Sequence, residues 1–265
     1  MPKFDFALNT PIMNAAGSLG FALDPNAPIN ISQLGAFVTN PISLRKRTPA
    51  RGPRLVEFSG GFLLHTGYPN PGLSHTIRQY ASQWGRSSLP ILVHLLVQSP
   101  TEVSRMVERL EGLDGVMGIE LGLPPDSDPG IAADLVNAAI GELPVIARLP
   151  LDHASELVPA LADFDLAALS LSPPRGALPG PNGELVHGRI YGPAVFPLAL
   201  AAVKKLVETG LPIIGAGGVY NSQDAEAMLA AGAFAIQLDT TLWRGNTLPI
   251  KNKNPLSDLG RGLGK

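Results

Sequence analysis

A glycine-rich turn near the C-terminal end has the clearest chemical meaning of any pattern in this chain. Gly215, Gly217 and Gly218 follow a short apolar run and precede a segment whose apolar residues recur at helical spacing. Because glycine lacks a side chain, the backbone here can approach a ligand closely, and its amides can bind a phosphate. The same pattern also connects strands to helices in proteins without a phosphate site, so both interpretations stay open.

The residues on either side predict the elements that would position this turn. The run at 212–215 is typical of a strand buried on both faces. Ser222 is expected to cap a helix over 222–231, and a second apolar run at 235–238 follows as the next strand. The stretch therefore has the order strand, turn, helix and strand.

That order repeats along the chain. Helical patterns separate most of the apolar runs, at residues 74–85, 100–112, 130–141, 153–163, 195–209 and 222–231, and the sequence from Ser99 to Glu102 predicts a capping box. Eight buried strands that alternate with helices predict one α/β domain over residues 1–265, a (β/α)8 TIM barrel rather than an open sheet. The expected strands are residues 12–15, 36–39, 91–96, 116–121, 145–149, 167–171, 213–215 and 235–238.

Two long insertions interrupt the repeat, at residues 41–73 and 172–193. Each follows a strand, so both are expected on the C-terminal face of the barrel, where barrel enzymes build their sites. Loops of this length are usually lids or ligand covers, and an insertion without function is the alternative.

Composition excludes several classes of function. The chain has 265 residues, a net charge of −2 and a pI near 6.2, so no overall field would attract nucleic acid or an anionic membrane. Cysteine is absent, which excludes disulfides, thiolate nucleophiles and iron–sulfur clusters. The sequence contains no signal-peptide pattern and no apolar run of membrane-spanning length, so a cytoplasmic location is expected. A basic segment, residues 44–54, is expected to be a solvated loop or a site for an anionic ligand or partner.

Six blocks of residues occur in the order and spacing of a known family. In these blocks the chain resembles the FMN-dependent dihydroorotate dehydrogenases, and the resemblance spans almost the whole chain. It implies a barrel that binds FMN and oxidises dihydroorotate to orotate in pyrimidine biosynthesis, while a base on a loop removes a proton. The blocks are residues 14–18, 60–72, 119–121, 192–197, 215–219 and 231–233.

The resemblance also implies which positions would contact the cofactor, and it implies no metal ion. These positions come from the ends of several expected strands and from the glycine-rich turn. They are Ala15, Ala16, Gly17, Asn40, Arg148, Gly192, Gly215, Gly217, Gly218, Asp239 and Thr240.

Residues that would perform the family's chemistry differ in this chain. The loop that holds the family's catalytic cysteine or serine corresponds to residues 122–126, which read GLPPD, and neither proline can accept a proton. Asn40 and Arg148 replace two flavin-contacting lysines. Leu64 and Ser170 align with asparagines, the first of which binds the substrate. Efficient oxidation of dihydroorotate is therefore not expected.

The phosphate end of the implied site differs as well. Asp239 and Thr240 stand where the family has Gly-Thr, and a carboxylate that faces a phosphate would repel it. A salt bridge from Asp239 to Arg244 or to another cation is the alternative interpretation. Tyr191 replaces a serine before Gly192, which predicts a narrower pocket.

The sequence does not identify a replacement for the missing base, so no catalytic residue is assigned. Histidines at positions 65 and 187 lie on the two insertions and could supply one, although a surface or packing role is commoner. Glu120 could face the top of the barrel or have a structural partner. No pair of histidines has metal-ligand spacing; the five are His65, His75, His94, His153 and His187.

Three kinds of function stay open. The chain could be a flavin-dependent oxidoreductase, a non-catalytic protein that binds a ligand or a partner, or a barrel enzyme that acts on another phosphorylated compound. A small-molecule ligand at the barrel mouth is expected in most of these cases, and both a monomer and a homo-oligomer are compatible with the sequence.

Overall fold

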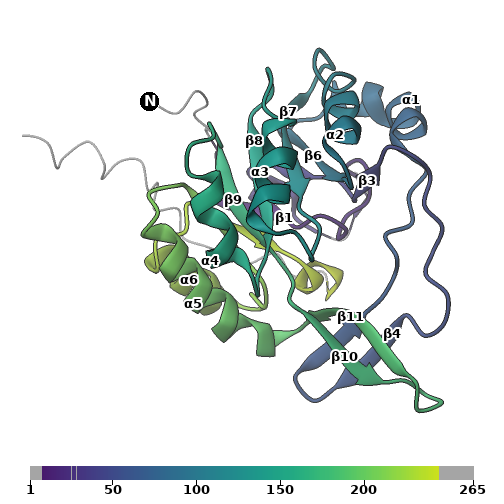
Figure 1. The fold of residues 1–265 in the computed structure, drawn as a ribbon, viewed down its shortest axis with the longest axis vertical. Helices are drawn as coiled ribbons and strands as arrows, with labels where there is room; N and C mark the ends of the chain where they lie inside the picture. The colour runs from purple at the N-terminus through teal and green to yellow at the C-terminus, as the bar shows by residue number, and fades with distance from the viewer. Residues whose placement is uncertain (1–7, 25, 28, 245–265) are drawn as a thin grey trace, which may run out of the picture.

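The computed structural model describes residues 8–24, 26, 27 and 29–244, and its centre is a barrel of parallel strands (Figure 1). Eight strands pair in the order β1-β13-β12-β9-β8-β7-β6-β2, and β3 (Ile42–Ser43) extends the pairing of β2 along β6. A parallel bridge between Met13 and Ala36 connects the two ends of the sheet. The predicted (β/α)8 barrel is confirmed. Its strands are β1 (Ile12–Asn14), β2 (Phe37–Val38), β6 (Ile91–Leu96), β7 (Val116–Gly122), β8 (Val145–Pro150), β9 (Ala168–Ser172), β12 (Ile213–Ala216) and β13 (Ala235–Leu238).

The Asn14 side chain holds the seam between β1 and β2 together. Its Oδ1 accepts the Val38 N–H at 2.8 Å, and its Nδ2 donates to the Val38 carbonyl at 2.7 Å. Asn14 is fully buried. The Asn14 carboxamide therefore forms the two hydrogen bonds that the backbone of a neighbouring strand would form. The two short strands have few ladder hydrogen bonds of their own.

We predict that Asn14→Ala lowers the free energy of unfolding by about 1–3 kcal/mol, because it leaves buried backbone groups of Val38 without partners. Urea denaturation measures the loss. Asn182→Ala, at an exposed turn residue, is the matched control and should change stability by less than about 0.5 kcal/mol. Equal stability of the two variants would show that the seam does not depend on Asn14.

Helices cover the outside of the barrel, with α1 and α2 near one end of the sheet and α5 and α6 near the other (Figure 1). The main apolar core lies between these helices and the strands, and a second, smaller cluster fills the barrel interior with side chains such as Met13, Leu92 and Ile146. The helices are α1 (Leu73–Trp84), α2 (Pro100–Val107), α3 (Pro129–Asn137), α4 (Ala154–Leu157), α5 (Phe196–Val207) and α6 (Ser222–Ala230), with short 3-10 turns η1 (Ile31–Gln33), η2 (Val158–Leu161), η3 (Pro193–Val195) and η4 (Thr240–Arg244).

Local helix structure differs from the sequence expectations in three places, two at helix caps and one in the type of helix. Asn221, not Ser222, caps α6: its side chain accepts the Asp224 N–H, and the Asp224 carboxylate accepts the Asn221 N–H. The expected box at α2 is half formed, because Ser99 caps the helix whereas the Glu102 carboxylate accepts the N–H of Gln98. The helix expected at 153–163 is α4 followed by η2, which contains a proline that cannot donate to an α-helical ladder.

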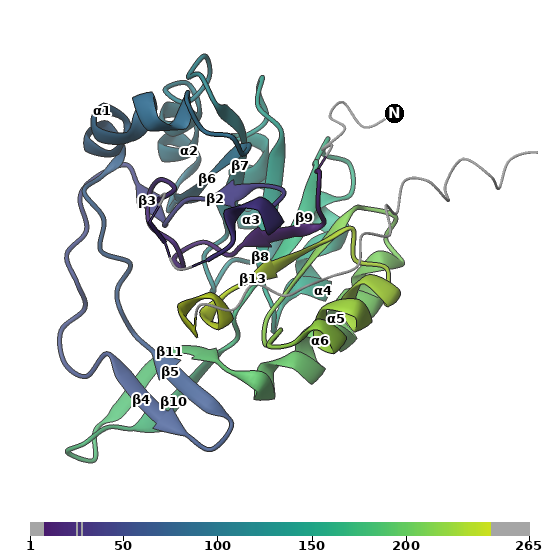
Figure 2. The same ribbon diagram turned by 180° about the vertical axis from the view of Figure 1, so that it is seen from behind.

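The two insertions meet in a separate antiparallel sheet beside the barrel mouth, seen from behind in Figure 2. Its order is β10-β11-β5-β4, and the pairing of β5 with β11 joins the first insertion to the second. Both insertions therefore lie on the same rim of the barrel, as predicted. The strands are β4 (Leu55–Phe58), β5 (Gly61–Leu64), β10 (Arg175–Pro179) and β11 (Leu185–Tyr191).

Candidate ligand site at the barrel mouth

A layer of polar side chains closes the barrel above its apolar interior. Glu120 on β7 is fully buried and accepts four hydrogen bonds from four strands. Its Oε2 contacts His94 Nδ1 at 2.6 Å and an Arg148 guanidinium nitrogen at 3.1 Å, while its Oε1 accepts from Ser170 Oγ at 2.8 Å and from Gln237 Nε2 at 2.6 Å. The structural role for Glu120 is therefore the correct interpretation.

The electrostatics of this layer decide which groups can take part in proton transfer. Burial alone would raise the pKa of Glu120, but Arg148, His94 and Gln237 together hold that pKa well below its usual range. Burial lowers the pKa of His94 in spite of its hydrogen bond to Glu120. Glu120 is thus a permanent acceptor, and a neutral His94 donates to it from Nδ1 and keeps a lone pair on Nε2.

The free nitrogen of His94 lies at the floor of the barrel mouth. A Cβ added at Gly122 would stand 2.8 Å from His94 Nε2, so any other residue there would cover this nitrogen. His94 borders a cavity of about 30 Å³ that also touches Arg148 and Arg189, which is room for a water-sized group. A sequence signal could have identified His94 as a site residue. His94 lies two residues after Leu92 on β6, and because strand side chains alternate between faces, it points into the barrel as Leu92 does.

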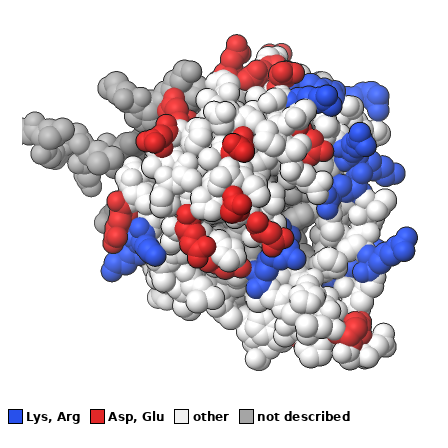
Figure 3. Space-filling view, viewed as in Figure 1, with Lys and Arg blue, Asp and Glu red and all other residues white. Residues whose placement is uncertain are grey.

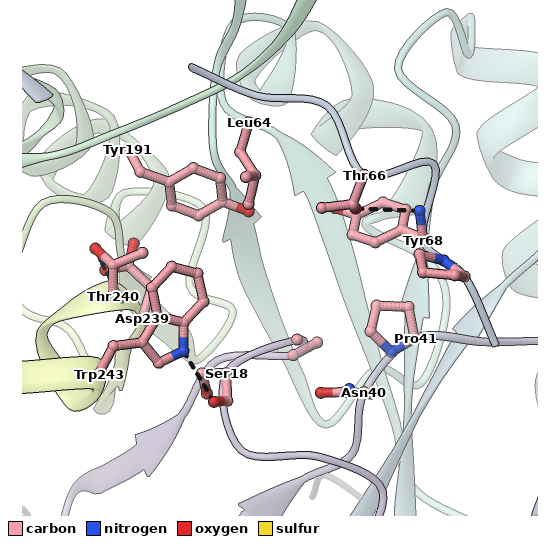
Figure 4. Close-up of a pocket in the computed structure, with 13 residues that line it drawn as sticks. Ser18, Asn40, Pro41, Leu64, Thr66, Tyr68, Tyr191, Asp239, Thr240 and Trp243 are labelled. Atoms are coloured by element: carbon pink, nitrogen blue, oxygen red, sulfur yellow. Dashed lines mark hydrogen bonds between the residues drawn. The ribbon is translucent and has the colours of Figure 1, made fainter. Parts of the chain in front are cut away.

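A central cavity of about 290 Å³ lies above this floor (Figure 4). The rings of Tyr191 and Trp243 form one wall. Phe62, which does not line the cavity, stacks on both, at 5.7 Å and 6.4 Å between ring centroids. Tyr68 and Pro41 lie across the cavity from Tyr191 and Trp243 in Figure 4. The lining residues are Ala16, Gly17, Ser18, Asn40, Pro41, Leu64, Thr66, Tyr68, Pro69, Tyr191, Asp239, Thr240 and Trp243.

Tyr68 and Trp243 were not recognised from the sequence as site residues. Tyr68 is the one non-glycine residue with positive φ, at 50°, in the described part of the chain, and the Arg189 guanidinium stacks on its ring at 4.3 Å from the centroid. Such a backbone conformation is uncommon outside glycine and is often found at binding sites. Trp243 is held by a hydrogen bond from its indole N–H to the Ser18 carbonyl at 3.0 Å.

The glycine-rich turn packs closely against the start of α5. Gly217 and Gly218 have φ values of 111° and 69°, and a Cβ at Gly218 would stand 2.4 Å from the Phe196 nitrogen. Within the described residues, the N–H groups of Gly217, Gly218 and Val219 have no hydrogen-bond acceptor. The turn therefore has a packing role and also keeps donors that an anion could use.

Asp239 occupies the other side of the expected phosphate position. Its Oδ1 accepts hydrogen bonds from the N–H and the hydroxyl of Thr240, and the same hydroxyl contacts the Tyr220 hydroxyl at 2.6 Å. Burial raises the pKa of Asp239 above its usual value. The expected alternative of a salt bridge to Arg244 is wrong: across the described residues Asp239 forms no ion pair, and Arg244 lies 5.2 Å over the Tyr220 ring instead.

The positions implied by the resemblance are only partly brought together. Ala16, Gly17, Asn40, Asp239 and Thr240 line the central cavity. Arg148 borders the small cavity below it, and Gly192 borders a third cavity beside Tyr220. Ala15 and Gly215 are buried, and Gly215 packs under α6, where a Cβ would meet the Met228 sulfur at 3.2 Å.

Neither His65 nor His187 has a hydrogen-bond partner that would orient it as a base within the described residues.

Comparison with known proteins decides the family. A sequence profile for Dihydroorotate dehydrogenase matches residues 3–128 and 180–258. The chain belongs to the dihydroorotate dehydrogenase family. Two relatives are the catalytic subunits of dihydroorotate dehydrogenase B (NAD(+)) from Geobacter sp. (strain M21) and from Maridesulfovibrio salexigens; each is 30% identical, over 255 and 264 residues, covering 88% and 90% of this chain and 83% and 86% of the relative.

Solved structures agree on the fold. A DHODH from Eimeria tenella crystallised with ferulenol has a TM-score of 0.71 at 14% sequence identity, covering 88% of this chain and 76% of the other. The ligand-free form of DHODH from the same organism has a TM-score of 0.68, with 89% and 80% covered. The dihydroorotate dehydrogenase family comprises flavin-dependent oxidoreductases of pyrimidine biosynthesis, so the site must be tested against FMN.

FMN fits one part of the dihydroorotate dehydrogenase-like site and not the other. The aromatic walls of the central cavity suit a flat ring. The phosphate end does not suit a dianion, because the Asp239 carboxylate already accepts from the Thr240 donors and forms no ion pair within the described residues. Among the described residues, no helix is long and apolar enough to cross a membrane, and no group of three or more His, Cys, Asp or Glu side chains is arranged to hold a metal ion.

Proposed function

We propose that this chain is a diverged family member that binds a small molecule at the barrel mouth and does not oxidise dihydroorotate efficiently. The observation behind the proposal is the composition of the loop after β7. Leu123, Pro124 and Pro125 border a second cavity next to the central one, where the resemblance would place the base, and none of them accepts a proton.

The ionisable groups near the loop do not restore the family's chemistry. His65 borders the second cavity, but within the described residues no hydrogen-bond partner orients its ring as a base. Glu120 is saturated by four partners and stays ionised. His94 is buried below Gly122 and reaches the mouth only through the small cavity. Leu64, in place of the substrate asparagine, lines both the central and the second cavity with an apolar side chain that cannot hold polar groups of dihydroorotate. The geometry favours binding of a flat ligand between aromatic walls over the family's proton abstraction.

We expect purified protein supplied with FMN, dihydroorotate and an artificial electron acceptor to turn over at least about 10²–10⁴-fold more slowly than ordinary enzymes, because loss of the base alone costs that factor. Steady-state reduction of the acceptor measures the rate. Turnover of about 1–10³ per second would contradict the proposal.

Trp243 fluorescence, compared between the wild type and Trp243→Phe, reports binding of riboflavin or orotate in the central cavity without any requirement for turnover.

A flavin-dependent oxidoreductase with another substrate is the second candidate function. Two observations favour it: the unused N–H groups of Gly217, Gly218 and Val219, and the Glu120–His94 pair, which orients an unprotonated imidazole nitrogen toward the mouth. The visible absorbance of the purified protein separates the two candidates. A yellow preparation with bound flavin favours the oxidoreductase, and a colourless protein that does not take up FMN favours the proposal above.

A further inference from the structure

The second cavity has an unusual concentration of positive charge. Its volume is about 260 Å³, and it lies between the small sheet and the loop after β7. Arg47, Arg175 and Arg189 all border it, and none of its lining residues is acidic. We call it the arginine cavity. Figure 3 shows basic side chains along the edge of the molecule that carries the first insertion, in a chain whose net charge is −2.

Two of the arginines face each other across a strand pair. Arg175 on β10 is the register partner of Arg189 on β11. Residues directly opposite in an antiparallel pair project from the same face of the sheet, with their Cβ atoms about 4.5–5.5 Å apart. Like charges in this arrangement repel and weaken the pairing. An anion between the two guanidinium groups would reverse the sign of that interaction.

The three guanidinium groups keep donors available for a ligand. No Asp or Glu in the described residues forms an ion pair with Arg47, Arg175 or Arg189. Arg47 uses only its Nε, which donates to the Gly67 carbonyl at 3.2 Å. The Arg189 guanidinium lies over the Tyr68 ring, 4.3 Å from its centroid, and within the described residues its N–H groups donate no side-chain hydrogen bond. The Arg47 and Arg189 side chains are thus partly ordered before a ligand arrives, so less entropy is lost on binding.

We propose that the arginine cavity binds a small organic anion through carboxylate or phosphate oxygens held by Arg175, Arg189 and Arg47. Guanidinium forks bind such oxygens through paired, charge-assisted hydrogen bonds. The cavity volume suits a small metabolite rather than a nucleotide. The arginine cavity adjoins the central cavity and shares Leu64, Thr66, Tyr68 and Tyr191 with it. This inference therefore rests on the proposed function and adds the chemical class of the ligand.

Isothermal titration with citrate and, separately, with inorganic pyrophosphate at one constant ionic strength tests the site. We expect at least one of the two to bind the wild type, and Arg175→Gln and Arg189→Gln each to weaken that binding about tenfold or more. Arg105→Gln, which removes an exposed arginine from α2, should leave the affinity unchanged. Tighter binding of citrate identifies a carboxylate ligand, and tighter binding of pyrophosphate identifies a phosphate ligand.

Folding is checked by the thermal unfolding midpoint in buffer without either anion. Arg175 is exposed and its replacement removes a repulsion, so the midpoint of Arg175→Gln should equal or exceed that of the wild type, while the rise caused by the anion should disappear. Absence of binding by both anions, or equal weakening by Arg105→Gln, would overturn the proposal. Riboflavin binding, followed by Trp243 fluorescence, tests the central cavity separately.

Discussion

Glu120→Gln should lower the free energy of unfolding by about 3–5 kcal/mol, because it leaves Arg148 as a buried charge without its counter-ion. The amide also offers one acceptor oxygen where the carboxylate serves four donors from His94, Arg148, Ser170 and Gln237. Urea denaturation followed by far-ultraviolet circular dichroism measures the loss. A change below about 1 kcal/mol would show that this polar layer does not stabilise the barrel.

Two controls identify the buried pair as the cause. Glu226→Gln, at an exposed position of α6, should change stability by less than about 0.5 kcal/mol. The double variant Glu120→Gln/Arg148→Met should be less destabilised than the sum of its single variants, since it removes both members of the pair together.

The pH dependence provides an independent readout of the same carboxylate. Because the pKa of Glu120 is depressed in the folded state, its contribution to stability is fully present above the usual glutamate pKa and is lost as the pH falls toward the folded-state value. Wild-type stability should therefore decline more steeply below about pH 4.5 than that of Glu120→Gln. Parallel curves would contradict the depressed pKa.

Asp239→Gly should strengthen the binding of FMN about tenfold or more, because it removes a buried carboxyl group that would repel the phosphate at the expected position whenever it is ionised. The substitution also releases the Thr240 N–H and hydroxyl, which the carboxylate now occupies. Calorimetric titration of both proteins with FMN measures the gain.

Asp239→Asn is the matched variant, since it removes the charge and keeps the shape of the side chain. If repulsion limits binding, both variants gain affinity; if only the occupied Thr240 donors limit it, the glycine variant alone gains. Weaker FMN binding by Asp239→Gly in a folded protein would show that this carboxylate is no obstacle to the phosphate.

Local sequence patterns were sufficient for the barrel but not for its details. All eight expected strands are present within one or two residues of their predicted ends, because buried apolar runs between turn residues are a strong local signal. Helix ends were less accurate: α2 ends at Val107 where the pattern extended to 112. The terminal turns of helices depend on capping residues and tertiary contacts, which the spacing of apolar residues does not predict. At α6, for example, Asn221 and not Ser222 is the cap.

The sequence by itself determined the fold class, the common rim of the two insertions, and the presence of proline where the family's base would stand in the loop after β7. Tertiary structure alone decided that Glu120 meets His94, Arg148, Ser170 and Gln237, and that Arg175 faces Arg189. The physical reason is that periodicity along a strand tells which face of that strand is buried. Periodicity does not tell which side chains from different strands meet at the same height in the barrel. That depends on the stagger of the closed barrel and on strand register, which are set by contacts between residues far apart in the chain.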